Sequence, residues 1–161
     1  MKRALLPLLA AILLLAATPT PSKAAPADDV TANIHHFIDA FNSGEFKEFY
    51  AAFAAGSVSI VDEFAPHFWA GPHAAQTWGD DYDKHAKATG VTDGVVAYGE
   101  PTRKVVSGAL AYVIVPCVYK YKENGKATEE EGQLTFVLHH EAGAWKIRSW
   151  TWTGVYPHPA K

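Results

Sequence analysis

The chain has 161 residues, of which 48% are hydrophobic and 19% charged, and its formal net charge is −3. This balance describes one globular domain that buries a core, and it excludes a collagen, a coiled coil or a disordered chain. The net acidic charge also argues against a nucleic-acid partner, because binding to phosphates requires clustered Lys and Arg.

The first 24 residues have the pattern of a secretory signal peptide. A basic start, Met1-Lys2-Arg3, precedes an apolar run from Ala4 to Ala17 that is too short to span a bilayer. Small residues fit cleavage after Ala24 or after Ala27, and an uncleaved membrane anchor is the alternative. Cleavage after Ala24 would change the net charge from −3 to −6. We therefore expect a periplasmic or secreted protein with no stable membrane anchor after cleavage.

The chain after the signal peptide is expected to fold as a single domain over residues 30–156. A short tail at 25–29 precedes this domain, and a C-terminal tail at 157–161 follows it. Apolar residues at helical spacing predict three helices, which cover residues 30–41, 45–55 and 72–90.

Strands are expected between the second and third helices and throughout the C-terminal half. Alternating apolar residues predict strands over residues 58–62, 93–106, 109–122, 128–140 and 144–154. Asn124-Gly125 indicates a tight hairpin, because both residues accept positive φ angles. Three helices followed by an antiparallel meander predict an α+β domain in which the helices pack against a curved sheet.

Three short segments resemble the nuclear transport factor 2-like superfamily, and within it the SnoaL-like and ketosteroid isomerase-like proteins. They are residues 37–44 (Phe-Ile-Asp-Ala-Phe-Asn-Ser-Gly), Trp69-Ala70-Gly71 and residues 143–147 (Gly-Ala-Trp-Lys-Ile). The resemblance covers most of residues 30–154 and implies a cone-shaped, cystatin-like sheet with a pocket at its open end. Because such proteins include isomerases, dehydratases and non-catalytic binding modules, this fold does not decide the function.

Asp62 is the candidate general base. It ends the strand at 58–62 and precedes Gly71 by nine residues, which is the spacing that the resemblance implies for a catalytic Asp. A carboxylate at the mouth of an apolar cavity has a raised pKa and can move protons next to a carbonyl group. The alternative is an ordinary Asp that is hydrogen-bonded to the loop after the strand. His67, in this loop, is a weaker candidate for assisting Asp62.

The resemblance also implies two donors to a developing oxyanion, a Tyr on the first helix and an acid on the penultimate strand. At these positions the chain has Phe37 and Thr135. An oxyanion donor contributes about 3–4 kcal/mol, so the loss of both argues against the familiar steroid-isomerase chemistry.

The last strand is expected to form a wall of the ligand pocket. Arg148, Trp150 and Trp152 alternate and so share one face of this strand. Two aromatic rings beside one cation would hold a flat, partly anionic ligand. The alternative is core packing, which is favoured for Trp150, with Arg148 paired to an acid. Further pocket residues are expected at Phe37, Trp69, Gln133 and Thr135.

A homodimer is expected through the outer face of the sheet. If Thr135 faces the pocket, then Leu134, Phe136 and Leu138 face outward and form an apolar patch. Covering this patch with a second copy of the chain would remove it from water. The alternative is that these three residues belong to a larger internal core.

No metal ion and no cofactor is expected. The adjacent histidines at 35–36 and 139–140 point apart, which leaves Asp62, His67 and His73 as the one plausible cluster. No zinc-binding spacing such as His-Glu-x-x-His occurs in the sequence.

Three functions remain open from the sequence. The first is an exported protein that binds a small carbonyl-containing or aromatic molecule in a hydrophobic, Trp-lined pocket. The second is an isomerase, cyclase or lyase that uses Asp62 as the general base on a carbonyl substrate. The third is a structural dimer without a ligand.

Overall fold

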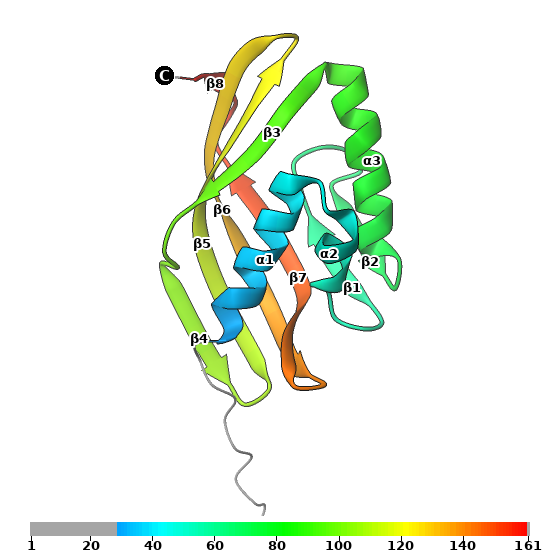
Figure 1. Ribbon diagram of the computed structural model, residues 1–161, viewed down its shortest axis with the longest axis vertical. Helices are drawn as coiled ribbons and strands as arrows, with labels where there is room; N and C mark the ends of the chain where they lie inside the picture. Colours follow the sequence, from blue (N-terminus) through cyan, green and yellow to red (C-terminus); the bar gives the residue numbers. More distant parts are fainter. Residues whose placement is uncertain (1–28, 161) are drawn as a thin grey trace, which may run out of the picture.

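The computed structural model describes residues 29–160, which form one α+β unit around a curved sheet (Figure 1). The expected signal peptide and both of its cleavage sites lie outside these residues. The helices are α1 (Asp29–Ser43), α2 (Phe46–Ala51) and α3 (Ala74–Thr89). The strands are β1 (Val58–Val61), β2 (Phe68–Gly71), β3 (Val91–Tyr98), β4 (Arg103–Ser107), β5 (Leu110–Glu123), β6 (Lys126–Glu141), β7 (Ala144–Gly154) and β8 (His158–Pro159).

The strands form one eight-stranded sheet in the order β2-β1-β7-β6-β5-β3. Strand β4 pairs with the start of β5, and β3 pairs with the end of β5. The pairing is antiparallel throughout except between β1 and β7, which run parallel. The predicted α+β class with helices against a curved sheet is confirmed, but the sheet is mixed through this one parallel pair, whereas the sequence predicted an antiparallel sheet.

Glycines end the first and third helices as expected. Gly44 and Gly90 have φ angles of +71° and +73°, which most other residues adopt only at a cost. The N–H of Gly90 donates to the carbonyl of Ala86 and closes the last turn of α3. The expected hairpin at Asn124-Gly125 is also present, because both residues have positive φ angles.

Several boundaries differ from the prediction. The expected strand over 93–106 is split into β3 and β4, because Pro101 lies in the break and lacks an N–H for the sheet. Strand β2 was not predicted, and residues 158–159 of the expected C-terminal tail pair with β6 as β8.

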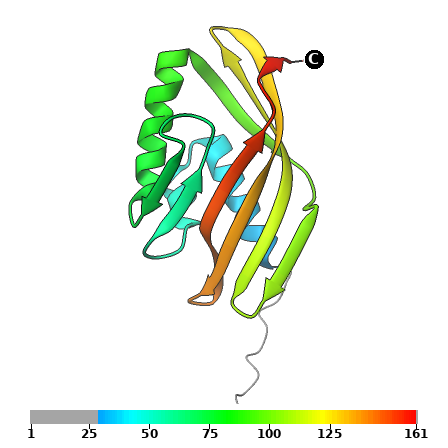
Figure 2. The same ribbon diagram turned by 180° about the vertical axis from the view of Figure 1, so that it is seen from behind.

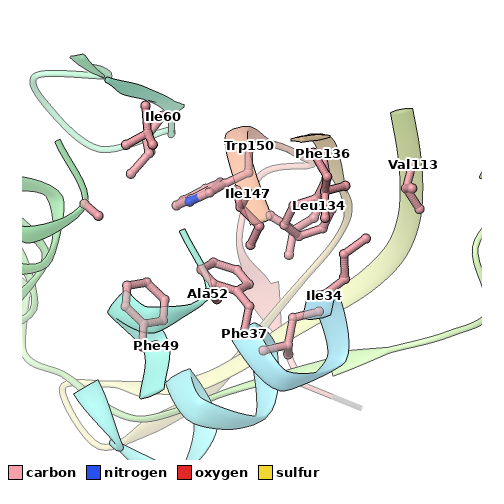
Figure 3. Packing of buried hydrophobic residues seen from close by; sticks show 14 of the residues in the cluster. Ile34, Phe37, Phe49, Ala52, Ile60, Val113, Leu134, Phe136, Ile147 and Trp150 are labelled. Carbon is pink, nitrogen blue, oxygen red and sulfur yellow. The ribbon is translucent and has the colours of Figure 1, made fainter. Parts of the chain in front are cut away.

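The hydrophobic core lies between α1 and the concave face of the sheet (Figures 1 and 3). The aromatic ring of Phe37 on α1 packs edge-on against that of Phe136 on β6, with 5.7 Å between the ring centroids. Asn42 fixes the other end of α1 to the sheet, because its side chain both donates to and accepts from the backbone of Val96. These contacts hold the helices at a fixed distance from the sheet.

The structure places Leu134, Phe136 and Leu138 in this core, with exposed fractions of 5%, 0% and 0%. Figure 3 shows Leu134 and Phe136 on the side of the sheet that faces α1. The placement of these residues on an outer dimer face was therefore wrong. Alternation along β6 instead turns Thr135 and Val137 to the outer face.

Among residues 29–160, no helix is both long enough and apolar enough to cross a membrane.

Candidate functional site

A partly enclosed cavity of about 120 Å³ lies between the helices and the concave face of the sheet. Its walls come from α1, the loop after β1, α3 and strands β3, β5, β6 and β7. The lining residues are Phe37, Ile38, Phe41, Asp62, Glu63, Phe64, Trp78, Tyr82, His85, Val91, Val96, Tyr119, Tyr121, Glu130, Leu134, Trp150 and Trp152. This lining is strongly aromatic and contains three carboxylates and no Lys or Arg.

Asp62 is held at the edge of this cavity by two donors. The indole N–H of Trp78 on α3 donates to its Oδ2 at 2.9 Å, and the backbone N–H of Glu63 donates to its Oδ1 at 2.8 Å. The backbone N–H of Asp62 itself donates to the carbonyl of His67, which closes the loop between β1 and β2. The carboxylate is therefore fixed in one orientation toward the cavity.

Burial raises the pKa of Asp62 from 3.8 to about 6. The two N–H donors act in the opposite direction, because they stabilise the ionised form, but they do not cancel the desolvation. Asp62 therefore changes its protonation state close to neutral pH, as a general base must do to be effective.

Two further carboxylates, Glu63 and Glu130, lie in the same lining. Burial raises the pKa of Glu63, and the neighbouring carboxylates of Glu130 and Asp62 raise it further. Glu130 is only 2% exposed, and its Oε1 accepts a hydrogen bond of 2.6 Å from the Tyr121 hydroxyl. The raised pKa of Glu63, about 8, therefore favours its protonated form at neutral pH.

Tyrosine hydroxyls continue this polar wall on β5 and α3. The hydroxyls of Tyr82 and Tyr119 are 2.6 Å apart, and the rings of Tyr119 and Tyr121 are stacked. Burial raises the pKa of all three phenols. They therefore remain protonated and serve as hydrogen-bond donors rather than as bases.

Three polar atoms of the lining are buried and have no hydrogen-bond partner among the described residues. They are the indole nitrogens of Trp150 and Trp152 and the Oε2 of Glu130. Glu63 is the nearest candidate partner, because the Trp152 indole lowers its pKa and Glu130 raises it, but neither Trp152 Nε1 nor Glu130 Oε2 forms a hydrogen bond in the described part of the folded chain. An unpaired buried polar group costs about 1–3 kcal/mol, so these atoms are prepared for a partner that the folded chain does not supply.

Four residues singled out from the sequence meet at this cavity: Asp62, Phe37, Trp150 and Trp152. Trp150 also packs as the core interpretation expected, because it is 3% exposed and its ring contacts that of Trp78 edge-on at 5.2 Å. Figure 3 shows Trp150 and Phe37 on facing elements.

Gln133, Thr135 and Arg148 lie outside the cavity lining. Gln133 and Thr135 alternate with Leu134 along β6 and so project from the opposite face of the sheet. Arg148 donates to the carbonyls of Ala55 and Ser57 and lies 3.8 Å from a carboxylate oxygen of Glu141. Arg148, the cation expected beside the pocket, is therefore not part of the lining. Its position removes the reason to expect a partly anionic ligand.

His67 and Trp69 also lie outside the lining. His67 is exposed and has a φ angle of +72° in the loop between β1 and β2. Trp69 is buried beside a shallow surface hollow, where its indole donates to Asp81 at 3.0 Å. Both residues support the loop that carries Asp62 and do not contact the cavity.

Sequence reasoning missed Glu63, Glu130 and His85. Glu130 shares a face of β6 with Leu134, so its position was readable from strand alternation. Glu63 lies in the loop after β1, where alternation gives no guide. His85 on α3 stacks on Phe64 with 5.1 Å between the ring centroids. Its place in the lining depends on the packing of α3, which no local pattern reveals.

Metal-ligand geometry occurs elsewhere in the described part of the chain. Within residues 29–160, Glu129, Glu131 and His158 are the one group of three such side chains whose ligand atoms lie within 4.8 Å of one another. His158 is already hydrogen-bonded to Glu131 at 2.6 Å. The cluster of Asp62, His67 and His73, which the sequence left as the one plausible alternative, does not form such a group.

The architecture and the cavity identify this chain as having the nuclear transport factor 2-like fold. Comparison of the sequence with known protein families and with curated proteins found no match. Comparison of the structure with solved structures found many.

The solved structures with this fold include enzymes that act on small molecules. A ketosteroid isomerase-like protein from Erwinia carotovora atroseptica superposes with a TM-score of 0.63 at 18% identity and covers 81% of this chain and 97% of its own. A hexachlorocyclohexane dehydrochlorinase from Novosphingobium barchaimii gives 0.68 at 12% identity and covers 83% of this chain and 88% of its own. A candidate scytalone dehydratase from Novosphingobium aromaticivorans gives 0.65 at 11% identity and covers 83% and 87%. At these identities the likeness concerns the fold, and the function must come from the site.

Proposed function

We propose that this protein binds a small, largely apolar molecule in the aromatic cavity and transfers a proton on it, with Asp62 as the general base. One observation carries this proposal: a carboxylate fixed by two N–H donors faces an apolar cavity, and burial has raised its pKa to about 6. A carbonyl compound is the matching substrate class, because a neighbouring carbonyl makes a carbon-bound proton acidic.

The reaction step follows from this geometry. The ionised Asp62 removes a proton from the carbon beside the carbonyl, and the electron pair of the C–H bond moves to the carbonyl oxygen to form an enolate. Asp62 is then neutral, so its desolvation is relieved at the moment when the negative charge moves to the substrate. Return of this proton to another carbon of the enolate completes an isomerisation. In heavy water the proton on Asp62 exchanges with solvent, and return of a deuteron to the carbon completes an isotope exchange.

The test is deuterium exchange into small cyclic ketones, such as 3-cyclohexen-1-one, in heavy water. The wild-type protein accelerates the exchange, and Asp62→Asn lowers the rate by about 10²-fold or more, because that is the usual contribution of a general base. Asp83→Asn is the matched control, since Asp83 is exposed on α3 and outside the cavity. Full activity of Asp62→Asn would overturn the assignment of the base.

Binding without catalysis is the second candidate. It is favoured by Phe37, which lines the cavity without a hydroxyl, and by Thr135, which lies outside it. A wild-type protein that binds the ketones and exchanges no deuterium, with equal binding by Asp62→Asn, would establish this function. Binding is measured through the fluorescence of the tryptophans, because Trp78, Trp150 and Trp152 line the cavity.

We also propose that the outer sheet face forms a homodimer, with different residues from those that the sequence indicated. Figure 2 shows this face, which no helix of the described chain covers. Val105, Tyr112 and Val137 are paired across β4, β5 and β6, and they are 42%, 39% and 36% exposed. Val137→Lys is expected to reduce the solution mass to that of a monomer in analytical ultracentrifugation, and an unchanged mass would remove this interface.

Export remains a proposal that is supported by the sequence pattern of residues 1–24. The mass of the intact protein, purified from the cells that produce it naturally, tests this proposal. We expect a chain that begins at Ala25, or at Asp28 if cleavage follows Ala27. A chain that retains residues 1–24 would contradict cleavage.

A further inference from the structure

The polar atoms of the residues that line the cavity indicate that its ligand carries polar groups in addition to an apolar body. Trp150 and Glu130 are 3% and 2% exposed, and the Nε1 of the first and the Oε2 of the second have no hydrogen-bond partner among the described residues. The Nε1 of Trp152 is a third such atom. Three residues that line the same cavity therefore carry one buried acceptor and two buried donors without partners among the described residues.

We propose that these three atoms recognise an uncharged ring compound that carries both a hydrogen-bond acceptor and a hydrogen-bond donor. The indole N–H groups of Trp150 and Trp152 donate to a carbonyl-type oxygen of the ligand, and the Oε2 of Glu130 accepts from a hydroxyl or an amide N–H. This inference names the ligand class for the site of the proposed function and rests on that function only for its location.

The two indole N–H groups also supply the hydrogen-bond donors that the proposed reaction requires at the enolate oxygen. An enolate requires hydrogen-bond donors at its oxygen, and neither Phe37 nor Thr135 supplies one. Indole N–H groups in a partly enclosed, aromatic cavity serve this purpose, because they are fixed and shielded from competing water. Trp150 and Trp152 come from one strand and occupy successive inward positions on it.

The charge of the wall excludes anions. Asp62, Glu63 and Glu130 contribute three carboxyl groups, and no Lys or Arg of the described chain lines the cavity. An anionic ligand would meet repulsion from the ionised Asp62, with no cation beside it to compensate, in a site of low polarity where charges are poorly screened. An uncharged ligand avoids this repulsion and still satisfies the buried polar atoms.

The cavity volume sets the size of the ligand. A cavity of about 120 Å³ is close to the engineered cavities of about 150 Å³ that hold benzene. The cavity therefore fits a ligand with a single ring, whose small substituents extend toward the open side of the cavity.

Four compounds that share one benzene ring test the proposal. They are 4-hydroxyacetophenone, with a donor and an acceptor; acetophenone, with the acceptor only; 4-methylphenol, with the donor only; and 4-hydroxybenzoate, which is anionic. Dissociation constants are measured at pH 7 by ligand-observed NMR and tryptophan fluorescence. We expect 4-hydroxyacetophenone to bind tightest, each single-group compound to bind roughly tenfold more weakly, and the anion to bind weakest.

Single substitutions test which side-chain atom binds which group of the ligand. Trp150→Phe and Trp152→Phe remove an N–H and are expected to weaken the two ketones while leaving 4-methylphenol within about twofold. Glu130→Gln is expected to weaken binding of the two uncharged hydroxyl compounds, 4-hydroxyacetophenone and 4-methylphenol, because its amide can present a donor in place of the carboxylate acceptor. Trp69→Phe is the control, since its indole N–H bonds Asp81 outside the cavity.

Three results would overturn the inference: equal binding of the three uncharged compounds, tightest binding of 4-hydroxybenzoate, or no binding of any of the four. Its failure is separable from failure of the proposed function. Selective binding without deuterium exchange leaves the recognition site standing and removes the catalytic role of Asp62. Deuterium exchange without selectivity among the four compounds would leave the catalytic role of Asp62 standing and remove the proposed recognition by Trp150, Trp152 and Glu130.

Discussion

Replacing Asp62 with asparagine is expected to change how stability depends on pH. The carboxylate is ionised at neutral pH in a half-buried position at the edge of an apolar cavity, and this ionised form is disfavoured by the fold. Each pKa unit corresponds to about 1.4 kcal/mol, so the rise in the pKa of Asp62 from 3.8 to about 6 makes its ionisation cost the folded state about 3 kcal/mol.

The sign of the effect follows from proton binding. Between pH 3.8 and about 6 the folded state holds more protons at Asp62 than the unfolded state, so stability falls as pH rises through this window. About 2 kcal/mol of the loss is expected between pH 4.5 and pH 7.5. Asp62→Asn has no such titration. The charge of Asp62 also raises the pKa of Glu63, so its removal acts in the same direction.

The assay is urea unfolding of both proteins at several pH values, followed by circular dichroism. One N–H that now donates to the carboxylate loses its acceptor in Asp62→Asn, but this offset does not depend on pH and cancels in the comparison. We expect the variant to gain about 2 kcal/mol relative to wild type from pH 4.5 to pH 7.5, and Asp83→Asn to lack this gain. A constant difference between wild type and Asp62→Asn across this range would refute the reasoning.

Three further predictions concern the support of the site. Trp78→Phe removes a donor to the carboxylate and raises the pKa of Asp62 further above about 6, which a ¹³C NMR titration measures; a lowered pKa would contradict the role of this hydrogen bond. Phe136→Ala costs about 3–5 kcal/mol in urea unfolding, because Phe136 is fully buried, and a cost near zero would mean that it lies at the surface. Asn42→Ala removes both hydrogen bonds to Val96 and costs about 1–3 kcal/mol; unchanged stability would show that α1 does not depend on them.

Local signals were sufficient for the helices and the hairpins. The apolar spacing of α1 and the positive φ angles at Gly44, Gly90 and Gly125 follow from single-residue chemistry and short-range periodicity. Strand β2 was missed because it has only four residues and one buried side chain, Trp69, so that alternation is hardly visible. The parallel pairing of β1 with β7 joins distant segments, and no local pattern carries that information.

The prediction of which β6 residues face the pocket was wrong by one residue. The resemblance placed Thr135 in the pocket, and this choice turned every second residue of the strand to the wrong face. The apolar alternation at Leu134, Phe136 and Leu138 pointed to the correct face, on which Glu130 also lies. A strand with a clear apolar face is therefore better oriented from its own pattern than from a distant likeness.

The position of Arg148 was mispredicted for a different reason. Its alternation with Trp150 and Trp152 predicted a shared face, yet Arg148 binds the carbonyls of Ala55 and Ser57 in the chain before β1. Strand β7 and its partner β6 shift register between Val137 and Leu138, which breaks the simple alternation in this part of the sheet. A bulge of this kind arises from tertiary pairing and leaves no mark in the sequence of the strand.

The most direct test of the central claim is the pH dependence of deuterium exchange into 3-cyclohexen-1-one by the wild-type protein. Only the ionised form of Asp62 removes a proton, so the rate is expected to rise about tenfold per pH unit at low pH and to level off above a pH of about 6. A rate that has already levelled off near pH 4, or that rises without levelling up to pH 8, would contradict Asp62 with its raised pKa as the base.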